Sequence, residues 1–184
     1  MIRPAKKTDA RRLLEIYDYY VQHTAVSFEY ETPSLEAFSA RMDRIMEGYP
    51  WLVAEQDGRV VGYAYAGPLK DRAAYARACE VTIYLDRSAQ KCGLGRKLYE
   101  ALEAALKRQG MLNLYACIGY PETADEYLTA NSAEFHAHLG YVRAGEFRRC
   151  GYKFGRWYGV LWMEKLIGEH LPQQPEGGGS SPAP

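Results

Sequence analysis

The stretch that decides the fold is DRSAQKCGLGRKLYEAL, residues 86–102, which carries two glycines one residue apart, Gly93 and Gly95. An amphipathic run begins directly after them, and an apolar strand-like segment, residues 78–86, precedes them. Four cations lie in the same stretch: Arg87, Lys91, Arg96 and Lys97. A glycine loop that opens a helix and carries positive charge is typical of an anion site, because the first helical turn exposes backbone N–H groups.

Three glycine-containing sequence motifs bind phosphate groups, and residues 90–98 do not match two of them. A P-loop needs Lys-Ser or Lys-Thr after its last glycine, but Arg96-Lys97 follows Gly95. A dinucleotide fingerprint needs a third glycine where Leu98 stands. The third device, Q/R-x-x-G-x-G/A, matches residues 90–95 and turns successive N–H groups onto a pyrophosphate. By itself this short pattern fits an ordinary helix-opening turn equally well.

Composition bounds the class of protein. The chain has 184 residues, 47% hydrophobic and 25% charged, which predicts one globular domain with a substantial core. Lys plus Arg and Asp plus Glu are 23 each, so the net charge is zero. This argues against nucleic acid or an anionic membrane as partner, and no apolar run is long enough to span a bilayer. The local cations therefore favour a small anionic ligand.

The cysteines and the C-terminal residues set further limits. No two of the 4 cysteines have C-x-x-C spacing, so neither a metal site nor a redox motif is expected. Reduced thiols in a cytoplasmic protein are the simplest interpretation. Residues 172–184 are rich in Pro, Gly and Ser and predict a disordered tail, which leaves residues 1–167 as the domain.

The order of predicted elements indicates an α+β fold. A strand at 2–5 is followed by a helix that Thr8 or Asp9 caps and that runs to about residue 23, an aromatic loop, and a helix from Ser34 to residue 46. Residues 51–67 form a hairpin around Asp57-Gly58. A strand at 78–86, a helix at 94–108, a strand at 112–118, a short helix ended by Gly140 and two strands within 141–166 complete the chain. The sheet is expected to be mostly antiparallel with one β-loop-α-β unit at its centre.

Three further segments give the glycine loop its context: AYARACEVTIYL (74–85), SAEFHAHLGY (132–141) and GYKFGRWY (151–158). With them, residues 2–165 resemble the GCN5-related N-acetyltransferases (GNAT), and within these the phosphinothricin and methionine-sulfoximine acetyltransferase branch. The resemblance implies the GNAT fold, a mixed sheet splayed at its middle strands and flanked by helices. It also implies acetyl-CoA as co-substrate, a small-molecule amine as acceptor, and a cytoplasmic homodimer.

The resemblance implies three groups of acetyl-CoA contacts. The pyrophosphate would lie on Gln90, Lys91, Cys92, Gly93, Leu94 and Gly95, with Arg96 and Lys97 beside it. The backbone of Val81, Thr82 and Ile83 would hold the thioester carbonyl and pair with the pantetheine arm, as an added strand would. Asn131 and Ser132 would meet pantetheine. The family's asparagine lies seven residues before the histidine, where this chain has Thr129, so either Thr129 or Asn131 can take that role.

Two side chains are candidates for the chemistry, which needs a base for the ammonium and an acid for the departing thiolate. Glu80 begins an apolar strand, and a carboxylate at the edge of a core has a raised pKa. A solvated charge at a strand end is the alternative, and the resemblance assigns Glu80 as the base. His136 takes the place of the acid in this branch, and its alternative is a histidine that is merely packed.

The acceptor pocket rests on the resemblance alone. Arg72 and Tyr75 align with branch residues that line it, and Arg77 is one place off the usual position. An arginine can grip a carboxylate through two hydrogen bonds. Phe28 and Glu31 match the aromatic loop that walls the pocket, and Gly159 stands where the branch has Asp.

Three functions remain open at this point. The first is acetylation of the α-amine of a small amino acid or analogue, such as phosphinothricin or methionine sulfone. The second is acetylation of another amine, such as a polyamine, an aminoglycoside or a protein N-terminus, although Arg72 and Arg77 suit a carboxylate better. The third is a non-catalytic acyl-CoA-binding module, which would need neither Glu80 nor His136.

Overall fold

The computed structural model describes residues 1–89 and 93–172. The predicted loop contacts of Gln90, Lys91 and Cys92 therefore lie outside the described residues, as does the predicted tail beyond Pro172. Within the described part of the chain, no helix is both long enough and apolar enough to cross a bilayer.

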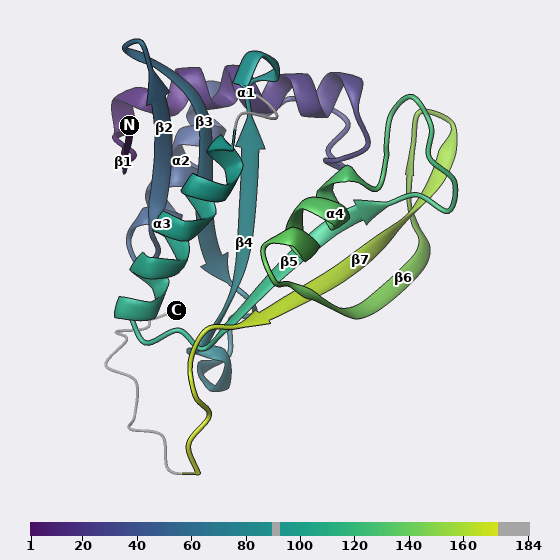
Figure 1. Ribbon diagram of the computed structural model, residues 1–184. Helices are drawn as coiled ribbons and strands as arrows, with labels where there is room; N and C mark the ends of the chain where they lie inside the picture. Colours follow the sequence, from purple (N-terminus) through teal and green to yellow (C-terminus); the bar gives the residue numbers. More distant parts are fainter. Residues whose placement is uncertain (90–92, 173–184) are drawn as a thin grey trace.

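The centre of the fold is a seven-stranded sheet in the order β1-β2-β3-β4-β5-β7-β6 (Figure 1). Its strands are β1 (Ile2–Pro4), β2 (Trp51–Gln56), β3 (Arg59–Pro68), β4 (Ala78–Leu85), β5 (Asn113–Tyr120), β6 (Val142–Lys153) and β7 (Arg156–Leu166). All neighbouring pairs are antiparallel except β4 and β5, which are parallel. The expected mixed, mostly antiparallel sheet is confirmed.

The two middle strands separate along their length, as Figure 1 shows. Their ladder runs from Ala78–Asn113 to Glu80–Tyr115, and no further pair joins them in the described chain. Beyond that point β4 stays paired with β3 as far as Leu85, while β5 stays paired with β7 as far as Tyr120. The predicted splay is therefore present, and it begins at Glu80.

Helices cover both faces of the sheet. The helices α1 (Ala10–His23) and α2 (Leu35–Met46) pack on one face, in a core that includes Trp51 and Tyr63. The helices α3 (Leu94–Arg108) and α4 (Asn131–His138) lie on the other face, in a second core. Alternate residues of β3 serve the two cores, since Tyr63 faces α1 and α2 whereas Ala64 belongs to the α3 side. This two-sided burial explains why β3 reads as a continuous apolar run.

Local sequence signals explain most of the element boundaries. Asp57 and Gly58 both have positive φ, 50° and 74°, as a tight hairpin turn requires. The side chain of Ser34 accepts a hydrogen bond from the Ala37 N–H and caps α2. The expectation that Asp9 caps α1 is wrong. The Asp9 carboxylate accepts from the Lys6 N–H and pairs with Arg3, and it makes no cap bond to α1. A strong ion partner outcompetes the helix terminus for this carboxylate.

The chain beyond β7 is attached to the start of β5. The Ile167 N–H donates to the carbonyl oxygen of Leu112, and His170 Nε2 lies 2.8 Å from Asn113 Oδ1. Gly168 fits against Leu112, where an added Cβ would lie 2.4 Å from a methyl carbon. Contacts with the domain thus continue a few residues past its predicted end at residue 167.

Candidate active site

A narrow hollow of about 50 Å³ lies where β4 and β5 separate. Residues 81–84 of β4 and 116–119 of β5 form its two sides. Tyr99 from α3 and two residues of α4, Ser132 and His136, line it from the helix face, and Val26 lines it from the loop after α1. The predicted strand residues Val81, Thr82 and Ile83 are therefore brought together with His136 and Ser132.

Glu80 lies at the point where the two strands begin to separate. It forms the last pair of the β4–β5 ladder, opposite Tyr115, and its side chain is half-buried. Burial raises the pKa of the Glu80 carboxyl above 4.5, and the positive charge of Lys70 opposes part of that shift. This environment is the one expected of a general base, and a fully solvated charge at a strand end would not show it.

His136 is buried, 3% exposed, and both of its ring nitrogens have partners. Nδ1 lies 2.7 Å from the carbonyl oxygen of Ser132, and Nε2 lies 2.8 Å from the hydroxyl of Tyr99. Burial lowers the pKa of His136 below 6.5, although the bond to Ser132 opposes the shift. Because a carbonyl only accepts, Nδ1 carries the proton, and Nε2 of the neutral ring accepts from Tyr99.

The start of α3 has the backbone geometry of an anion site. Gly93 precedes the helix with a φ of 76°, a conformation that side chains rarely adopt. The first-turn N–H groups of α3 have no earlier carbonyl within the helix to bond. Of the predicted contacts, Arg96 and Lys97 are exposed beside this terminus, while the Leu94 side chain is buried in the core. Leu94 could therefore contribute only backbone to a ligand.

Gly95 has a packing role of its own. A Cβ at this position would lie 3.0 Å from the ring of Phe135 on α4. The glycine therefore lets α3 and α4 approach closely, which in turn brings Tyr99 against His136. Gly95 is therefore needed for the packing of α3 against α4, whether or not its backbone also contacts a ligand.

The segment before the glycine loop is held by ion pairs and rings. The carboxylate of Asp86 pairs with Arg12 and accepts from the N–H and hydroxyl of Ser88. Burial alone would raise the pKa of Asp86, but these bonds outweigh it and lower the pKa to about 2. Arg87, the fourth cation of the stretch, lies over the ring of Tyr19 at 4.7 Å.

The α4 residues divide between the pocket and solvent. Ser132 lines the hollow, whereas Asn131 is exposed at the first position of the helix. Thr129 is also exposed, and its hydroxyl accepts from the Asn131 N–H. Thr129 and Asn131, the two alternatives for the pantetheine contact, are not among the described residues that line the hollow, whereas Ser132 is.

The predicted acceptor residues come from two segments, the loop after α1 and the residues before β4. Arg72 and Tyr75 are exposed at the short 3-10 helix η2 (Ala73–Tyr75) before β4, and Glu31 is exposed in the loop after α1. Phe28 is half-buried against β5 and β6, because added Cβ atoms at Gly119 and Gly151 would meet its ring.

Arg77, also predicted to line the acceptor pocket, is half-buried and bonded to backbone groups just before β4. Its guanidinium donates to the carbonyl oxygen of Gly110, and its own carbonyl accepts from Leu112 and Asn113. Arg77 therefore joins the start of β4 to the α3–β5 turn.

Three residues near the site were missed by the sequence analysis: Lys70, Tyr99 and Cys117. Lys70 is the cation whose charge acts on Glu80. The pKa of the Cys117 thiol on β5 is raised to about 12, first by burial and then by the charge of Glu80. Of these three, only Tyr99 could have been found from the sequence. Its phenol lies one helical turn after Gly95 on a buried face, and a buried phenol needs a hydrogen-bond partner.

Gly159, which stands where the resembled branch has Asp, lies on β7 with the backbones of β5 and β6 close on either side. An added Cβ would be 2.9 Å from the carbonyl oxygen of Phe147 and 3.3 Å from that of Tyr120. The bulge of β6 between Phe147 and Gly151 brings this backbone close. Glycine is thus required by the local path of β6 in this chain.

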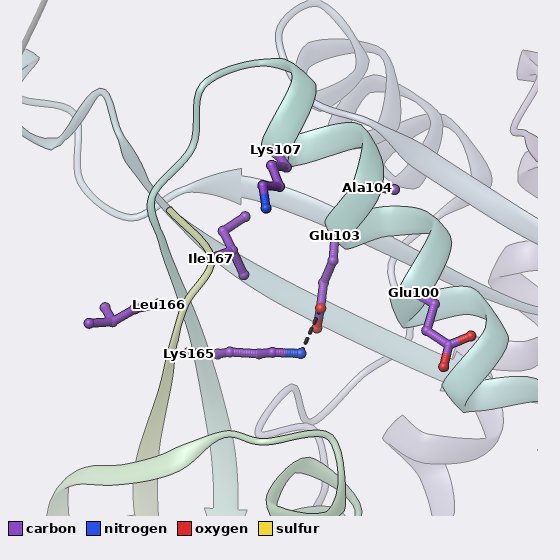
Figure 2. Close-up of a pocket in the computed structure, with 7 residues that line it drawn as sticks. All are labelled: Glu100, Glu103, Ala104, Lys107, Lys165, Leu166 and Ile167. Carbon is purple, nitrogen blue, oxygen red and sulfur yellow. Dashed lines mark hydrogen bonds and ion pairs between the residues drawn. The ribbon is translucent and has the colours of Figure 1, made fainter. Parts of the chain in front are cut away.

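A larger hollow, of about 440 Å³, lies between α3 and the end of β7, away from the strand separation (Figure 2). Its central charges are paired, because Lys165 Nζ lies 2.6 Å from Glu103 Oε2. It contains neither Glu80 nor His136, so volume alone does not mark the reactive site. Among residues 1–89 and 93–172, no three His, Cys, Asp or Glu side chains are grouped to hold a metal ion.

The family follows from comparison with known proteins. Residues 2–162 match the family model described as "Acetyltransferase (GNAT) domain". The chain belongs to the GNAT acetyltransferase family. The chain is an acetyl-CoA-dependent N-acetyltransferase.

Similar proteins cover nearly the whole chain. A phosphinothricin N-acetyltransferase of Streptomyces viridochromogenes is 35% identical over 95% of this chain and 91% of its own. An L-methionine sulfoximine/L-methionine sulfone acetyltransferase of Salmonella typhimurium is 33% identical over 92% and 95%. A solved GNAT phosphinothricin acetyltransferase of Sinorhizobium meliloti, in complex with acetyl-CoA, has a TM-score of 0.88 and 30% identity over 98% and 95%.

Proposed function

We propose that this GNAT enzyme transfers the acetyl group of acetyl-CoA to the α-amine of a small amino acid or amino-acid analogue. The observation that carries the proposal is the position of Glu80, a half-buried carboxylate with a raised pKa at the mouth of the β4–β5 separation. The names of the relatives support an acceptor of the phosphinothricin or methionine sulfone type.

Glu80 is proposed to take the proton of the acceptor's ammonium, directly or through a water. The free edge of β4 at residues 81–83 would hold the thioester carbonyl through backbone N–H groups. Attack of the neutral amine on that carbonyl forms the new C–N bond and leaves a second proton on the acceptor nitrogen. The nitrogen loses this proton as the C–S bond breaks and the amide forms. The departing thiolate needs a proton.

The proton for the thiolate is proposed to come from Tyr99 and His136 acting together. In the neutral pair the Tyr99 hydroxyl donates to Nε2 and offers no proton to the hollow. Transfer of the second proton of the acceptor nitrogen to Nε2 would reverse this bond and turn the hydroxyl hydrogen towards the hollow. The thiolate then takes the Tyr99 proton while His136 returns one to the tyrosine oxygen, so the pair loses one proton in all.

The residues at the start of α3 fit the pyrophosphate of acetyl-CoA. Gly93 supplies the positive φ, the first-turn N–H groups supply donors, and Arg96 and Lys97 supply exposed positive charge. Ser132 is proposed to contact the pantetheine arm. Phe28, Glu31, Arg72, Tyr75 and Arg77 remain proposed acceptor contacts, with Lys70 added for its effect on Glu80.

A homodimer is proposed through the β6–β7 hairpin. Four of its large apolar side chains are 49–61% exposed: Val142, Phe147, Tyr152 and Trp157. The strand β6 is also an edge of the sheet, so a second copy can cover both the side chains and the open backbone groups. Trp157→Glu should give a monomer by size-exclusion chromatography with light scattering, and Leu171→Glu, equally an exposed apolar residue, should not.

The three described cysteines, Cys79, Cys117 and Cys150, are unbridged thiols, which supports a proposed place in the reducing cytoplasm.

A panel of amines tests the proposed function. Release of free CoA thiol from acetyl-CoA should be fastest with methionine sulfone, methionine sulfoximine or phosphinothricin, and slow with spermidine or an aminoglycoside. A peptide with a free N-terminus serves as the third acceptor class. Faster release with any of these alternatives would overturn the acceptor assignment, and no release with any amine would favour a binding module.

A further inference from the structure

The buried lysine at the end of β6 carries an inference beyond the reaction itself. Lys153 is 2% exposed, and its ammonium donates three hydrogen bonds of 2.7–2.8 Å to backbone carbonyl oxygens. The acceptors are Val21, Thr24 and Ser27. An ammonium has three N–H donors, so this arrangement uses all of them on one short segment.

The position of the ammonium has an electrostatic reason. Val21 and Thr24 lie in the last turn and at the C-cap of α1, where unpaired carbonyls concentrate negative partial charge. Burial lowers the pKa of Lys153, and the nearby carboxylate of Glu29 opposes that shift. A buried lysine is costly unless its donors are satisfied, and here the helix end and the loop after it satisfy them.

The segment that Lys153 holds, residues 24–28, forms one wall of the reactive hollow. Val26 from this segment lines the hollow together with β4 and β5. Further contacts seat the segment: the Ala25 N–H donates to Tyr127, and the hydroxyl of Ser27 bonds that of Tyr17.

The same hairpin presses on the segment at a second place. Gly151, two residues before Lys153, faces the ring of Phe28, and an added Cβ would lie 2.2 Å from a ring carbon. The end of β6 therefore contacts the segment at two places: Lys153 bonds the carbonyls of Thr24 and Ser27, and Gly151 packs against the ring of Phe28. The chain separation is 126–132 residues, so this contact is entirely a product of the fold.

We infer that Lys153 is a positioning residue for the acceptor: it holds residues 24–28 in place, so that the proposed acceptor contact Phe28 depends on it, and acceptor binding depends on it much more than acetyl-CoA binding does. Among the described residues, the three hydrogen bonds of this lysine go to the end of α1 and the loop after it, and none goes to the start of α3. The identity of the acceptor rests on the proposed function, but the clamp itself does not.

Lys153→Met is the test, because it keeps the length of the side chain and removes the three donors. The matched control is Lys165→Met, which breaks the Lys165–Glu103 ion pair of β7 and α3 without touching the segment. Hydrogen exchange, read by mass spectrometry on peptides that cover residues 24–30, should quicken about 10-fold or more in Lys153→Met alone. The KM for the best amine of the panel should rise about 10-fold, while the KM for acetyl-CoA stays within about two-fold.

Gly151→Ala provides a second variant if Lys153→Met does not fold. It displaces Phe28 with the lysine intact, and the same split between the two KM values is expected. Unchanged exchange in residues 24–30 of Lys153→Met, or equal rises of both KM values in the folded variants, would overturn the inference. If no amine of the panel is acetylated, the proposed function fails, and the exchange experiment still decides whether the clamp exists.

Discussion

Nε2 of His136 lies 2.8 Å from the hydroxyl oxygen of Tyr99, and this bond joins α4 to α3 beneath the separated strands. Both groups are buried, and the other ring nitrogen of His136 is occupied by Ser132. The histidine is therefore locked into one tautomer, and its access to the hollow passes through a tyrosine.

The first prediction concerns this pair. Nitrogen NMR of His136 should report the Nδ1–H tautomer and a pKa below 6.5, because burial disfavours the imidazolium. Tyr99→Phe should lower kcat about 100-fold, because it removes the hydroxyl that passes a proton to the thiolate. The KM for acetyl-CoA should change little. An Nε2–H tautomer, or a kcat unchanged in Tyr99→Phe, would refute the relay.

The same pKa shift sets a direction for stability. The folded state resists protonation of His136 and the unfolded state does not, so the free energy of unfolding should decrease as the pH falls below 6.5. His136→Gln should weaken this dependence in denaturant titrations at pH 7 and pH 5. His138→Gln is the control, because that histidine is exposed on the same helix.

Glu80→Gln should lower turnover about 100-fold or more, within the range usual for a positioned base. Thermal stabilisation by acetyl-CoA should persist, since the start of α3 is untouched. In the wild type, kcat/KM should fall as the pH drops through a pKa above 4.5, because only the carboxylate can accept a proton. The loss in the variant should shrink as the pH rises and more acceptor amine is neutral. Wild-type turnover of Glu80→Gln at pH 7 would remove Glu80 as the base.

Gly93→Val should abolish the stabilisation by acetyl-CoA that a ligand of the folded state must give. The matched control is Gly58→Val in the β2–β3 turn. Both glycines have nearly equal φ, 76° and 74°, and no atom within 4 Å of an added Cβ. The two variants therefore carry similar backbone strain, and only Gly93 faces the proposed pyrophosphate. Equal thermal shifts with acetyl-CoA in both variants would contradict the phosphate assignment.

Much of the fold was predictable because its signals are local. Asp57-Gly58 and Ser34 act on their own neighbours, and the alternation around Glu80 follows from strand geometry. The missed features depend on partners far along the chain, as Tyr99 and His136 do at a separation of 37 residues. The bond from Arg77 to the carbonyl of Gly110 has the same origin, since nothing in the sequence around Arg77 indicates it. The crowding at Gly159 likewise depends on the bulge of another strand.

The end of the domain gives a prediction from two truncations. A chain that ends at Leu171 should unfold at the same temperature as the full protein, because the removed residues offer little to bury. A chain that ends at Leu166 should be less stable, since it loses the Ile167–Leu112 and His170–Asn113 contacts. Equal melting temperatures for the two truncations would show that these contacts contribute nothing.

The last prediction separates two cations near the acceptor. Lys70 lowers the pKa of Glu80 by its charge, whereas Arg72 is exposed at the start of η2. If Arg72 grips the acceptor carboxylate, the α-amine is left free to point at Glu80, and such orientation can supply several kcal/mol of the barrier. Arg72→Ala should then raise the KM for methionine sulfone about 10-fold and leave the KM for acetyl-CoA unchanged.

Lys70→Ala should behave differently, because it removes a charge that acts on the base. The acid limb of its kcat/KM profile should move to higher pH, since the pKa of Glu80 rises when the positive charge is lost. Arg72→Ala should leave that limb in place, and Arg108→Ala, an exposed arginine at the end of α3, should change neither quantity. An unchanged KM for methionine sulfone in Arg72→Ala, or spermidine turned over faster than methionine sulfone, would end the carboxylate assignment. Acetyl transfer at Glu80 would stand in either case, because it depends on the separated strands and not on what holds the acceptor.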